Sequence, residues 1–466
     1  MKNILAFLCF VTAFSQVANA QYNQQWFVAH HPAGAMLPTK AAKLHVAGDH
    51  LYVLATVQGN PVNDEDIMLI KYDMQGNLVW EKRYGVPGNF HEKAVDMAID
   101  ELGSIYITGE SSLEGPASAH DFCTIKYTPE GTQVWVQRFG VKEHGESPCR
   151  IKVRNGMVFV TGKTNTAAGT STTENVHSII YNASTGKEVW SNSGNGPGGN
   201  WRTYAEDMTL DGGNNLVIVG RRGGGPNFDY SIMRYKWDTI PPKKPTDSIK
   251  IVLVFDWARS YNGTANDNDN AMFVTTNNAG DIYVTGESYS KEGRQDITTT
   301  KYDKLGNKLW DRLMNGTNNN IDLPIGIGLD SKENIIVGGT LQNVKPKPNQ
   351  SKENFCTIKY NPEGDTLWTT AWRNIAGVTT KMQVMAIDKE DHIFTGGATI
   401  APPVEPYVRK LNPDGQMVWE TRIKNPDGTV LFGELYVMHI DQKGNLYFSG
   451  FNGVSRKMFL TKYSKQ

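Results

Sequence analysis

The chain has 466 residues, of which 39% are hydrophobic and 10% aromatic. This is enough apolar material for one large core or for several small ones in a row. The 47 Lys and Arg residues balance 48 Asp and Glu residues, which argues against a nucleic-acid-binding protein, because such a protein needs a basic surface to displace counterions.

The first residues predict an export signal. Lys2 gives a positive start, the apolar stretch ILAFLCFVTAF follows, and Ala18, Asn19 and Ala20 form a small-x-small cleavage site. We expect residues 1–20 to be a Sec-type signal peptide and the mature chain to be periplasmic or extracellular. A lipoprotein signal using Cys9 would cut the apolar stretch short. Because no other apolar run approaches the roughly 18 residues of a membrane helix, no transmembrane segment is expected.

A hairpin pattern recurs along the mature chain. The stretch CTIKYTPEGTQVW (123–135) is repeated as CTIKYNPEGDTLW (356–368), and both indicate a strand, a Pro-Gly turn and a second strand ending in Trp. Related stretches occupy 67–80, 178–190, 299–310 and 408–419, and a copy at 231–257 is stretched by a Pro-Lys-rich insert. A second type of hairpin alternates with the first, at 94–111, 272–288, 384–397 and 435–450.

The repeated Trp sets the period of the pattern. Its spacing runs from 51 to 67 residues, which gives eight units of four strands. Four-stranded units at this period predict an all-β fold, an eight-bladed β-propeller of four-stranded antiparallel blades, as one domain over 21–466. The Trp residues in this register are Trp26, Trp80, Trp135, Trp190, Trp257, Trp310, Trp368 and Trp419.

The ends of the chain predict how the ring closes. If the strands of a blade are named A to D from the centre outward, the chain starts with a D strand (24–31) and ends with a C strand (459–466). We therefore expect the N-terminal strand to complete the last blade, which also covers an exposed strand edge.

Several recurring residues are expected to be structural. A Trp at one position of every unit is expected to pack between blades, because a ligand site rarely repeats in every unit. Gly109, Gly162, Gly220 and Gly286 end B strands, where the backbone of a neighbour comes close. Cys123 and Cys356 fall on opposite blades, too far apart for a disulfide, so both are expected to be buried apolar side chains.

The repeat resembles a known bacterial family. The stretches GNLYFSG, GDIYVTGES and FCTIKYTPEG, followed by a Trp strand, are similar to the SBBP propeller repeats of exported proteins. That family label implies seven blades, whereas eight are counted in this sequence. YNASTGKEVW (181–190) resembles the eight-bladed quinoprotein-type propellers, whose dehydrogenases carry an adjacent cysteine pair. This chain has no such pair, so the second resemblance implies the shape and argues against that enzyme.

The long, dissimilar connections predict a binding face. They are nearly all of the B–C and D–A kind, as in KTNTAAGTSTTENVH (163–177), and antiparallel topology places both kinds at one end of the ring. An aromatic residue outside the Trp register, beside Arg, suits a sugar or a peptide. Charged residues at the ends of B strands could converge on a polar ligand. The candidate ligand-binding residues are Trp201, Arg202, Tyr204, Glu110, Lys163, Arg221, Arg222 and Glu287.

One acidic stretch is a candidate metal site. Asp267 and Asp269, within NDNDN (266–270), could hold calcium, although the full spacing of a calcium loop is missing. Four loop histidines show no metal spacing such as H-x-x-x-H, so zinc is not expected. These are His91, His120, His144 and His177. No other cofactor is expected.

The sequence therefore favours a non-catalytic binding or scaffold module of the bacterial cell envelope. Its partner would be a protein, a peptide or a glycan held by the long-loop face, and the protein is expected to be a monomer. The alternative is a funnel-site enzyme, either carbohydrate-active or a quinoprotein-like oxidoreductase. An enzyme should gather groups with displaced pKa values in the funnel, whereas a binding module should show an aromatic and polar patch.

Overall fold

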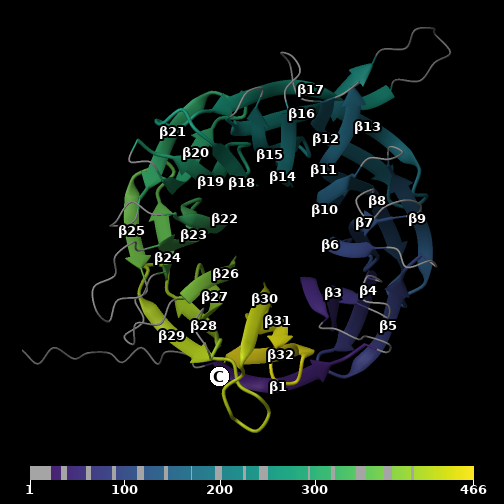
Figure 1. Ribbon diagram of the computed structural model, residues 1–466, viewed down its shortest axis with the longest axis vertical. Helices are drawn as coiled ribbons and strands as arrows, with labels where there is room; N and C mark the ends of the chain where they lie inside the picture. Colours follow the sequence, from purple (N-terminus) through teal and green to yellow (C-terminus); the bar gives the residue numbers. More distant parts are fainter. Residues whose placement is uncertain are drawn as a thin grey trace, which may run out of the picture.

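The computed structural model describes residues 22–32, 39–58, 65–86, 91–112, 120–140, 145–168, 171–194, 202–223, 227–240, 250–291, 294–315, 321–342, 353–371, 380–399 and 403–465. Every regular element in these residues is a β-strand, 32 in all. They form eight four-stranded sheets arranged as a ring (Figure 1). The described part of the chain contains no helix with the length and hydropathy of a membrane span.

Each blade runs from an inner A strand to an outer D strand (Figure 1). The A strands are β2 (Lys40–Ala47), β6 (Glu92–Ile99), β10 (Ser147–Arg154), β14 (Arg202–Leu210), β18 (Asp269–Thr276), β22 (Leu323–Leu329), β26 (Thr380–Ile387) and β30 (Gly433–Ile440). The B strands are β3 (His50–Gln58), β7 (Ile105–Ser111), β11 (Met157–Ala168), β15 (Leu216–Gly223), β19 (Ile282–Tyr289), β23 (Ile335–Gln342), β27 (Ile393–Thr399) and β31 (Leu446–Asn452).

The outer half of each blade has the same order. The C strands are β4 (Glu65–Asp73), β8 (Asp121–Tyr127), β12 (Ser171–Asn182), β16 (Asp229–Ile240), β20 (Gln295–Tyr302), β24 (Glu353–Tyr360), β28 (Pro406–Leu411) and β32 (Lys457–Lys465). The D strands are β5 (Leu78–Tyr84), β9 (Gln133–Phe139), β13 (Glu188–Gly194), β17 (Lys250–Tyr261), β21 (Lys308–Met314), β25 (Thr366–Ala371), β29 (Met417–Arg422) and β1 (Tyr22–His30). The predicted fold class and blade count are confirmed.

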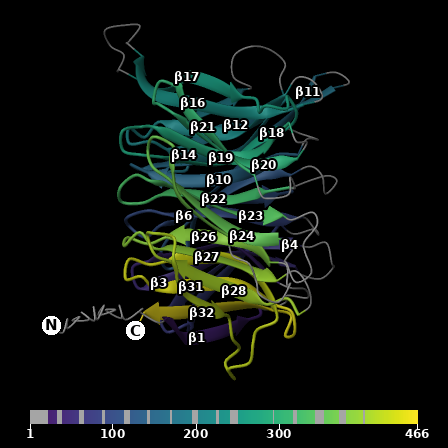
Figure 2. The same ribbon diagram turned by 90° about the vertical axis from the view of Figure 1, so that its left-hand side faces the viewer.

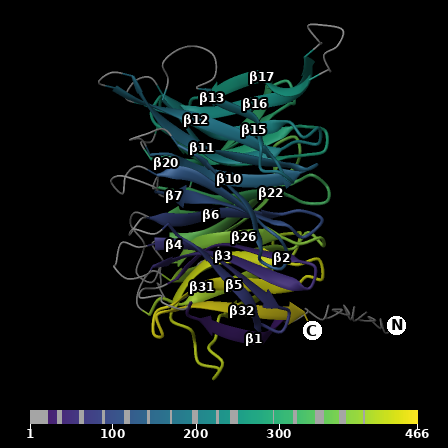
Figure 3. The same cartoon turned by 90° about the vertical axis from the view of Figure 1, so that its right-hand side faces the viewer.

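The ring closes as the sequence predicts. β1 pairs antiparallel with β32, from Tyr22 opposite Lys465 to His30 opposite Met458, and becomes the outer strand of blade 8. The Thr461 hydroxyl donates a hydrogen bond to the Trp26 carbonyl at 2.7 Å. Figures 2 and 3 show β1 beside β32 from two opposite sides. The predicted signal peptide, residues 1–20, lies outside the described residues.

The Trp side chains lie between neighbouring blades. The Trp310 indole N–H donates to the Pro362 carbonyl at 3.0 Å, in the C–D turn of the next blade, and Lys301 donates to the same carbonyl at 3.1 Å. The turn residue Gly364 has a φ of +88° and lies against the indole, where a Cβ would be 2.8 Å from the ring. The same indole-to-turn bond is made by Trp26, Trp135, Trp257 and Trp368.

Two Trp residues meet a different partner because the turn is missing. Trp190 packs edge-on against Tyr235, with ring centroids 5.5 Å apart, where the long β16–β17 hairpin replaces the short turn. Trp419 packs against Tyr22 and Tyr463 at 5.2 and 6.2 Å, where the two chain ends replace it. Trp80 also lies on a turn glycine, but its indole nitrogen has no hydrogen-bond partner in the described residues.

Each A strand carries a β-bulge opposite a small residue of the B strand. In blade 4 the register shifts between Ala205 and Asp207. The Tyr204 carbonyl then leans over Gly220, where a Cβ would lie 1.9 Å from the oxygen. Gly109, Gly162 and Gly286 are covered in the same way by carbonyls of their A strands, at 2.3, 2.1 and 2.0 Å. The bulge also turns the extra residue, Glu206 in blade 4, out of the regular alternation.

Buried aspartates join neighbouring inner strands. Asp96 of β6 accepts a hydrogen bond from the Ile151 N–H of β10 at 3.2 Å. Asp207 of β14 accepts one from the Val274 N–H of β18 at 3.1 Å and pairs with Arg150 at 2.6 Å. These contacts link one A strand to the next around part of the ring. Cys123 and Cys356 are buried in β8 and β24, on opposite blades.

The A–B and C–D turns form one end of the ring, the turn face, and the B–C and D–A connections form the other, the loop face. The segment 163–177, expected to be a loop, is instead an extended hairpin, because β11 and β12 stay paired as far as Ala168 and Ser171. Its β-branched Thr residues suit a strand. The β16–β17 hairpin extends to Ile240 and Lys250 on the opposite face, as the positions of β11 and β17 show in Figure 2.

The bulge predicts which glycines tolerate a side chain. Gly220→Ala is expected to lower the free energy of unfolding by about 1 to 3 kcal/mol, because its Cβ would overlap the Tyr204 carbonyl oxygen. Urea denaturation followed by Trp fluorescence measures the loss. Gly326→Ala is the matched control, since its Cβ would meet only Met385 at 3.5 Å. Equal losses in the two variants would contradict this explanation.

Ring closure can be tested with a cross-link. Asn23 and Ser464 are directly opposed on β1 and β32, and opposed antiparallel residues have Cα atoms about 4.5 to 5.5 Å apart, within disulfide range. The variant carrying Asn23→Cys and Ser464→Cys is expected to oxidise and to gain about 2 to 4 kcal/mol of stability, which a reductant removes. Asn23→Cys alone is the control. Failure of the double variant to cross-link would argue against the pairing.

Candidate functional site

The inner rim of the loop face is where the A strands begin and the B strands end. Its residues are eight cross-strand pairs at equivalent register: Lys40 with Thr56, Lys93 with Glu110, Ser147 with Lys163, Tyr204 with Arg221, Asn270 with Glu287, Leu323 with Thr340, Lys381 with Ala398, and Glu434 with Phe451. The predicted residues Glu110, Lys163, Arg221 and Glu287 therefore occupy the same B-strand position in blades 2, 3, 4 and 5. The predicted Tyr204 lies opposite Arg221 on the A strand of blade 4. Arg222 is one residue further along β15 and alternates to the other side of the sheet.

Blade 4 gathers an arginine–aromatic cluster on this rim. The Arg221 guanidinium lies 4.5 Å from the centre of the Tyr204 ring and 5.3 Å from that of Phe228. Arg202 lies 5.0 Å from the Phe228 ring, and the two aromatic rings are 5.6 Å apart. The predicted Arg202, Tyr204 and Arg221 thus come together. Trp201 lies outside the described residues.

Two acids of displaced pKa lie beside this cluster. Burial raises the pKa of the Glu206 carboxyl, and the positive charges of Arg221 and Lys163 offset part of that rise. Burial also raises the pKa of Glu287, which Arg221 lowers and Glu206 raises further. Arg221 is therefore the cation shared by carboxylates of blades 4 and 5. Glu206 was not predicted, because the A-strand bulge that re-aims its side chain gives no signal in the sequence.

Glu110 belongs to a separate part of the rim. Its carboxylate is nearly buried, accepts a hydrogen bond from the Ser147 hydroxyl and lies 3.7 Å from the Lys93 ammonium. These contacts tie Glu110 to blades 2 and 3 and leave it apart from the Arg221 cluster.

Phe228, at the centre of the arginine–aromatic cluster, was also not predicted. It is an aromatic residue outside the Trp register that directly follows the Gly-rich stretch RRGGGPN (221–227).

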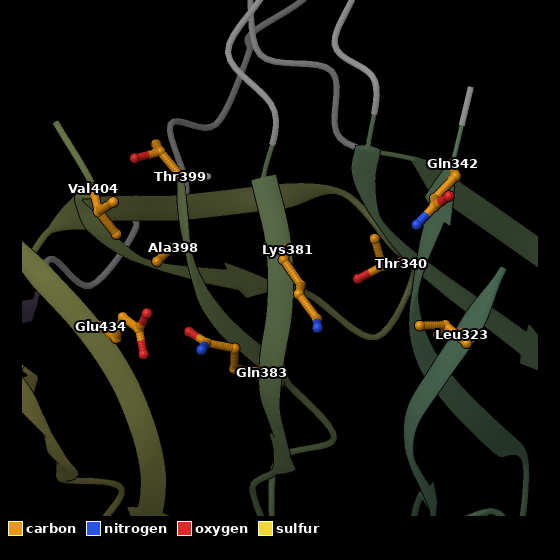
Figure 4. A pocket seen from close by; sticks show the side chains of 9 residues that line it. All are labelled: Leu323, Thr340, Gln342, Lys381, Gln383, Ala398, Thr399, Val404 and Glu434. Carbon is orange, nitrogen blue, oxygen red and sulfur yellow. The ribbon is translucent and has the colours of Figure 1, made fainter. Parts of the chain in front are cut away.

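A pocket of about 450 Å³ opens on the rim between blades 6 and 8 (Figure 4). In Figure 4, Gln383 and Glu434 project toward each other from β26 and β30, and Lys381 extends toward Thr340. The Gln383 Oε1 atom is buried and accepts no hydrogen bond from the described residues. Leu323, Ala398 and Val404 supply the apolar part of the lining. Gln383 is the bulged residue of β26, as Glu206 is of β14.

The two predicted calcium ligands point to different partners. Asp269 is buried, and its oxygens accept hydrogen bonds from the Gly263 and Tyr289 N–H groups at 2.6 and 3.1 Å. Burial raises its pKa to about 6. Asp267 accepts a hydrogen bond from the Asn268 N–H at 2.7 Å. Calcium binding by this pair stays a prediction.

Comparisons with known proteins bear on the fold alone. No family model matches the chain, and no curated protein matches it. The WD40 domain of SCAP from fission yeast aligns with 96% of this chain and 98% of its own at 8% identity, with a TM-score of 0.48. Polysaccharide lyase Uly1 aligns over 94% of this chain and 91% of its own at 12% identity, with a TM-score of 0.44.

The β-propeller domain of the Trilobed protease from Pyrococcus furiosus aligns with 84% of this chain and 98% of its own at 8% identity, with a TM-score of 0.42. At such identities and TM-scores, these likenesses carry no argument about ligand or activity.

The charge of Arg221 beside Glu206 and Glu287 leads to a prediction about how the stability of the protein depends on pH. Because the folded state raises the pKa values of Glu206 and Glu287, it binds their protons more tightly than the unfolded chain, and stability falls as pH rises through those values. Arg221→Met removes the offsetting charge. We expect this variant to show a steeper decrease of the free energy of unfolding with rising pH. The free energy of unfolding should be lower than that of the wild type by about 1 to 3 kcal/mol when both acids are ionised.

Urea denaturation between about pH 5 and about pH 8 measures this effect. Arg221→Lys keeps the charge and is expected to retain most of the stability at the upper end of that range. A loss in Arg221→Met that does not change with pH would show that the arginine acts by packing alone.

Proposed function

We propose that this chain is an exported, non-catalytic binding or scaffold propeller of the bacterial cell envelope, of the SBBP-repeat kind, that recognises a protein, a peptide or a glycan on its loop face. The observation that carries the proposal is the polar pocket at the inner rim, lined by Lys381, Gln383 and Glu434. Export, with cleavage after Ala20, rests on the N-terminal sequence, and sequencing the N-terminus of the exported protein tests it.

The pocket has the chemistry of a recognition site. It offers an ammonium, a carboxylate, an amide and the Thr340 hydroxyl within one hollow, together with apolar side chains. Binding sites commonly combine a few placed polar groups with an apolar wall. The Gln383 side-chain carbonyl oxygen is buried without a hydrogen-bond partner among the described residues. A buried acceptor without a partner is destabilising, and a donor group from a ligand would satisfy it.

The arginine–aromatic cluster extends the same rim. Tyr204 and Phe228 offer ring surface, and Arg221 and Arg202 offer donors beside it. Aromatic and Arg side chains dominate the energy of many interfaces. Because this cluster and the pocket lie on one rim, a ligand longer than the pocket could contact both.

The proposal predicts the effect of pocket variants. The exported protein, screened on a glycan array and on a displayed peptide library, is expected to bind members of one of them. Lys381→Met and Gln383→Leu are each expected to weaken that binding at least about tenfold, because each removes a hydrogen bond to a desolvated ligand. Lys304→Met, on the turn face, is the control. Binding that survives both pocket variants, or no binder on either array, would overturn the proposal.

A funnel-site carbohydrate-active enzyme is the second candidate, favoured by the paired acids Glu206 and Glu287. Carboxyl groups with raised pKa values serve as general acids in glycoside hydrolysis. Turnover of fluorogenic glycosides that is lost in Glu287→Gln would decide for the enzyme. The quinoprotein-like alternative has less support, because the sequence contains no adjacent cysteine pair.

A further inference from the structure

Two histidines and a glutamate meet where three segments of blade 2 reach the loop face. His91 immediately precedes β6, Glu110 lies near the end of β7, and His120 immediately precedes β8. One ligand atom from each of the three lies within 4.8 Å of the other two. The two imidazole centroids are 5.2 Å apart. The topology of a single blade thus gathers residues that are far apart in the sequence.

Each of the two imidazole rings is held in place through its own Nδ1 atom. His91 Nδ1 lies 3.0 Å from the Glu65 carboxylate at the start of β4, in the neighbouring blade. His120 Nδ1 lies 2.8 Å from the Ser112 hydroxyl. The Nε2 atoms are therefore the ones left to coordinate a cation. Metal-binding histidines are commonly oriented in this way, by a carboxylate or another polar group on the second nitrogen.

The backbone around the cluster is also fixed. The Ser112 N–H donates to the His91 carbonyl at 3.3 Å, and the Glu146 N–H donates to the His120 carbonyl at 2.6 Å. An isolated parallel bridge joins Glu65 to His91. The three donor residues are thus positioned before any ion arrives, which reduces the ordering that binding requires.

The donor set indicates the class of ion. Two imidazole nitrogens and a carboxylate oxygen suit Zn²⁺ and related transition-metal ions, whereas Ca²⁺ prefers oxygen ligands alone. Zinc ligands at roughly 2.1 Å in a tetrahedron are about 3.4 Å apart. Since the three ligand atoms lie within 4.8 Å of one another, the side chains need to approach by at most about 1.4 Å. His91 and His120 are only partly buried, which leaves a side from which a fourth ligand can enter.

We propose that His91, Glu110 and His120 bind one divalent transition-metal ion, with zinc preferred, and that its fourth position takes water or a donor group from a ligand on the loop face. Lys93 opposes the ion in the present arrangement, since its ammonium lies 3.7 Å from the Glu110 carboxylate. That side chain is half exposed, so it can swing away when a metal ion takes its place beside Glu110.

A second cluster on the turn face serves as a contrast. Asp388, Glu390 and His392 also lie close together, but all three belong to one A–B turn. Asp388 accepts hydrogen bonds from the Glu390 and His392 N–H groups, both at 2.9 Å. Lys465 pairs with Glu390 at 3.3 Å. The turn and this ion pair explain the second cluster without a metal.

The test uses the mature chain without a histidine tag, stripped of metal with a chelator. It is titrated with Zn²⁺ by calorimetry and with Co²⁺ by visible absorption, which reports tetrahedral coordination. We expect one saturable site. His91→Ala and His120→Ala are each expected to weaken binding at least about 100-fold, and Glu65→Gln about 10- to 100-fold. Lys93→Met is expected to tighten it, because a competing cation is removed. Circular dichroism checks the fold of each variant.

His392→Ala is the matched control and is expected to bind zinc as the wild type does. The proposal is overturned if the wild type shows no saturable site, if His392→Ala alone abolishes binding, or if His91→Ala and His120→Ala leave it unchanged. Should the two histidine variants fail to fold, Glu65→Gln and Lys93→Met decide, and unchanged affinity in both overturns it.

Discussion

The contact on which the ring depends is an indole resting on the turn of the next blade. Trp310 shows it most fully, because its N–H bonds the Pro362 carbonyl while its face covers Gly364. Glycine is required at position 364, since its φ is +88° and a Cβ would overlap the Trp310 indole. The ammonium of Lys301 bonds the same carbonyl and fixes the turn from a second direction. Repetition of this contact sets the spacing between blades at their outer parts.

The same contact bears on where the candidate site residues lie. It uses the C–D turns, so these stay short and alike wherever the Trp needs them. The B–C and D–A connections share a backbone hydrogen bond, in which the N–H at the start of an A strand donates to the carbonyl at the start of the preceding blade's C strand, as from Glu146 to His120 and from Asp269 to Phe228. Away from that bond they differ in length and sequence. The arginine–aromatic cluster around Phe228, the pocket with Gln383 and the histidines of blade 2 all lie on that freer face. The long and dissimilar connections are thus concentrated at one end of the ring, with the β16–β17 hairpin as the exception at the other.

Most of the fold could be predicted because repetition is visible in a single sequence. The Trp register gave the number of blades, and counting strands gave the closure. The site was predictable only in part. Glu110 and Arg221 fall at one repeat position, so their common rim could be foreseen. Glu206 and Gln383 could not, because a bulge re-aims them. His91 and His120 meet only because strand topology returns the chain to the same spot, which spacing rules do not detect.

Closure of the ring has a consequence for how the protein is made. The bond between Thr461 and the Trp26 carbonyl spans 435 positions of sequence. β1 leaves the ribosome long before β32, so it stays without its partner while the strands between them are made, and such distant pairings form slowly. A chain cut short before β32 leaves β1 without a partner and blade 8 incomplete. Assembly of blade 8 thus joins the first and the last of the described strands.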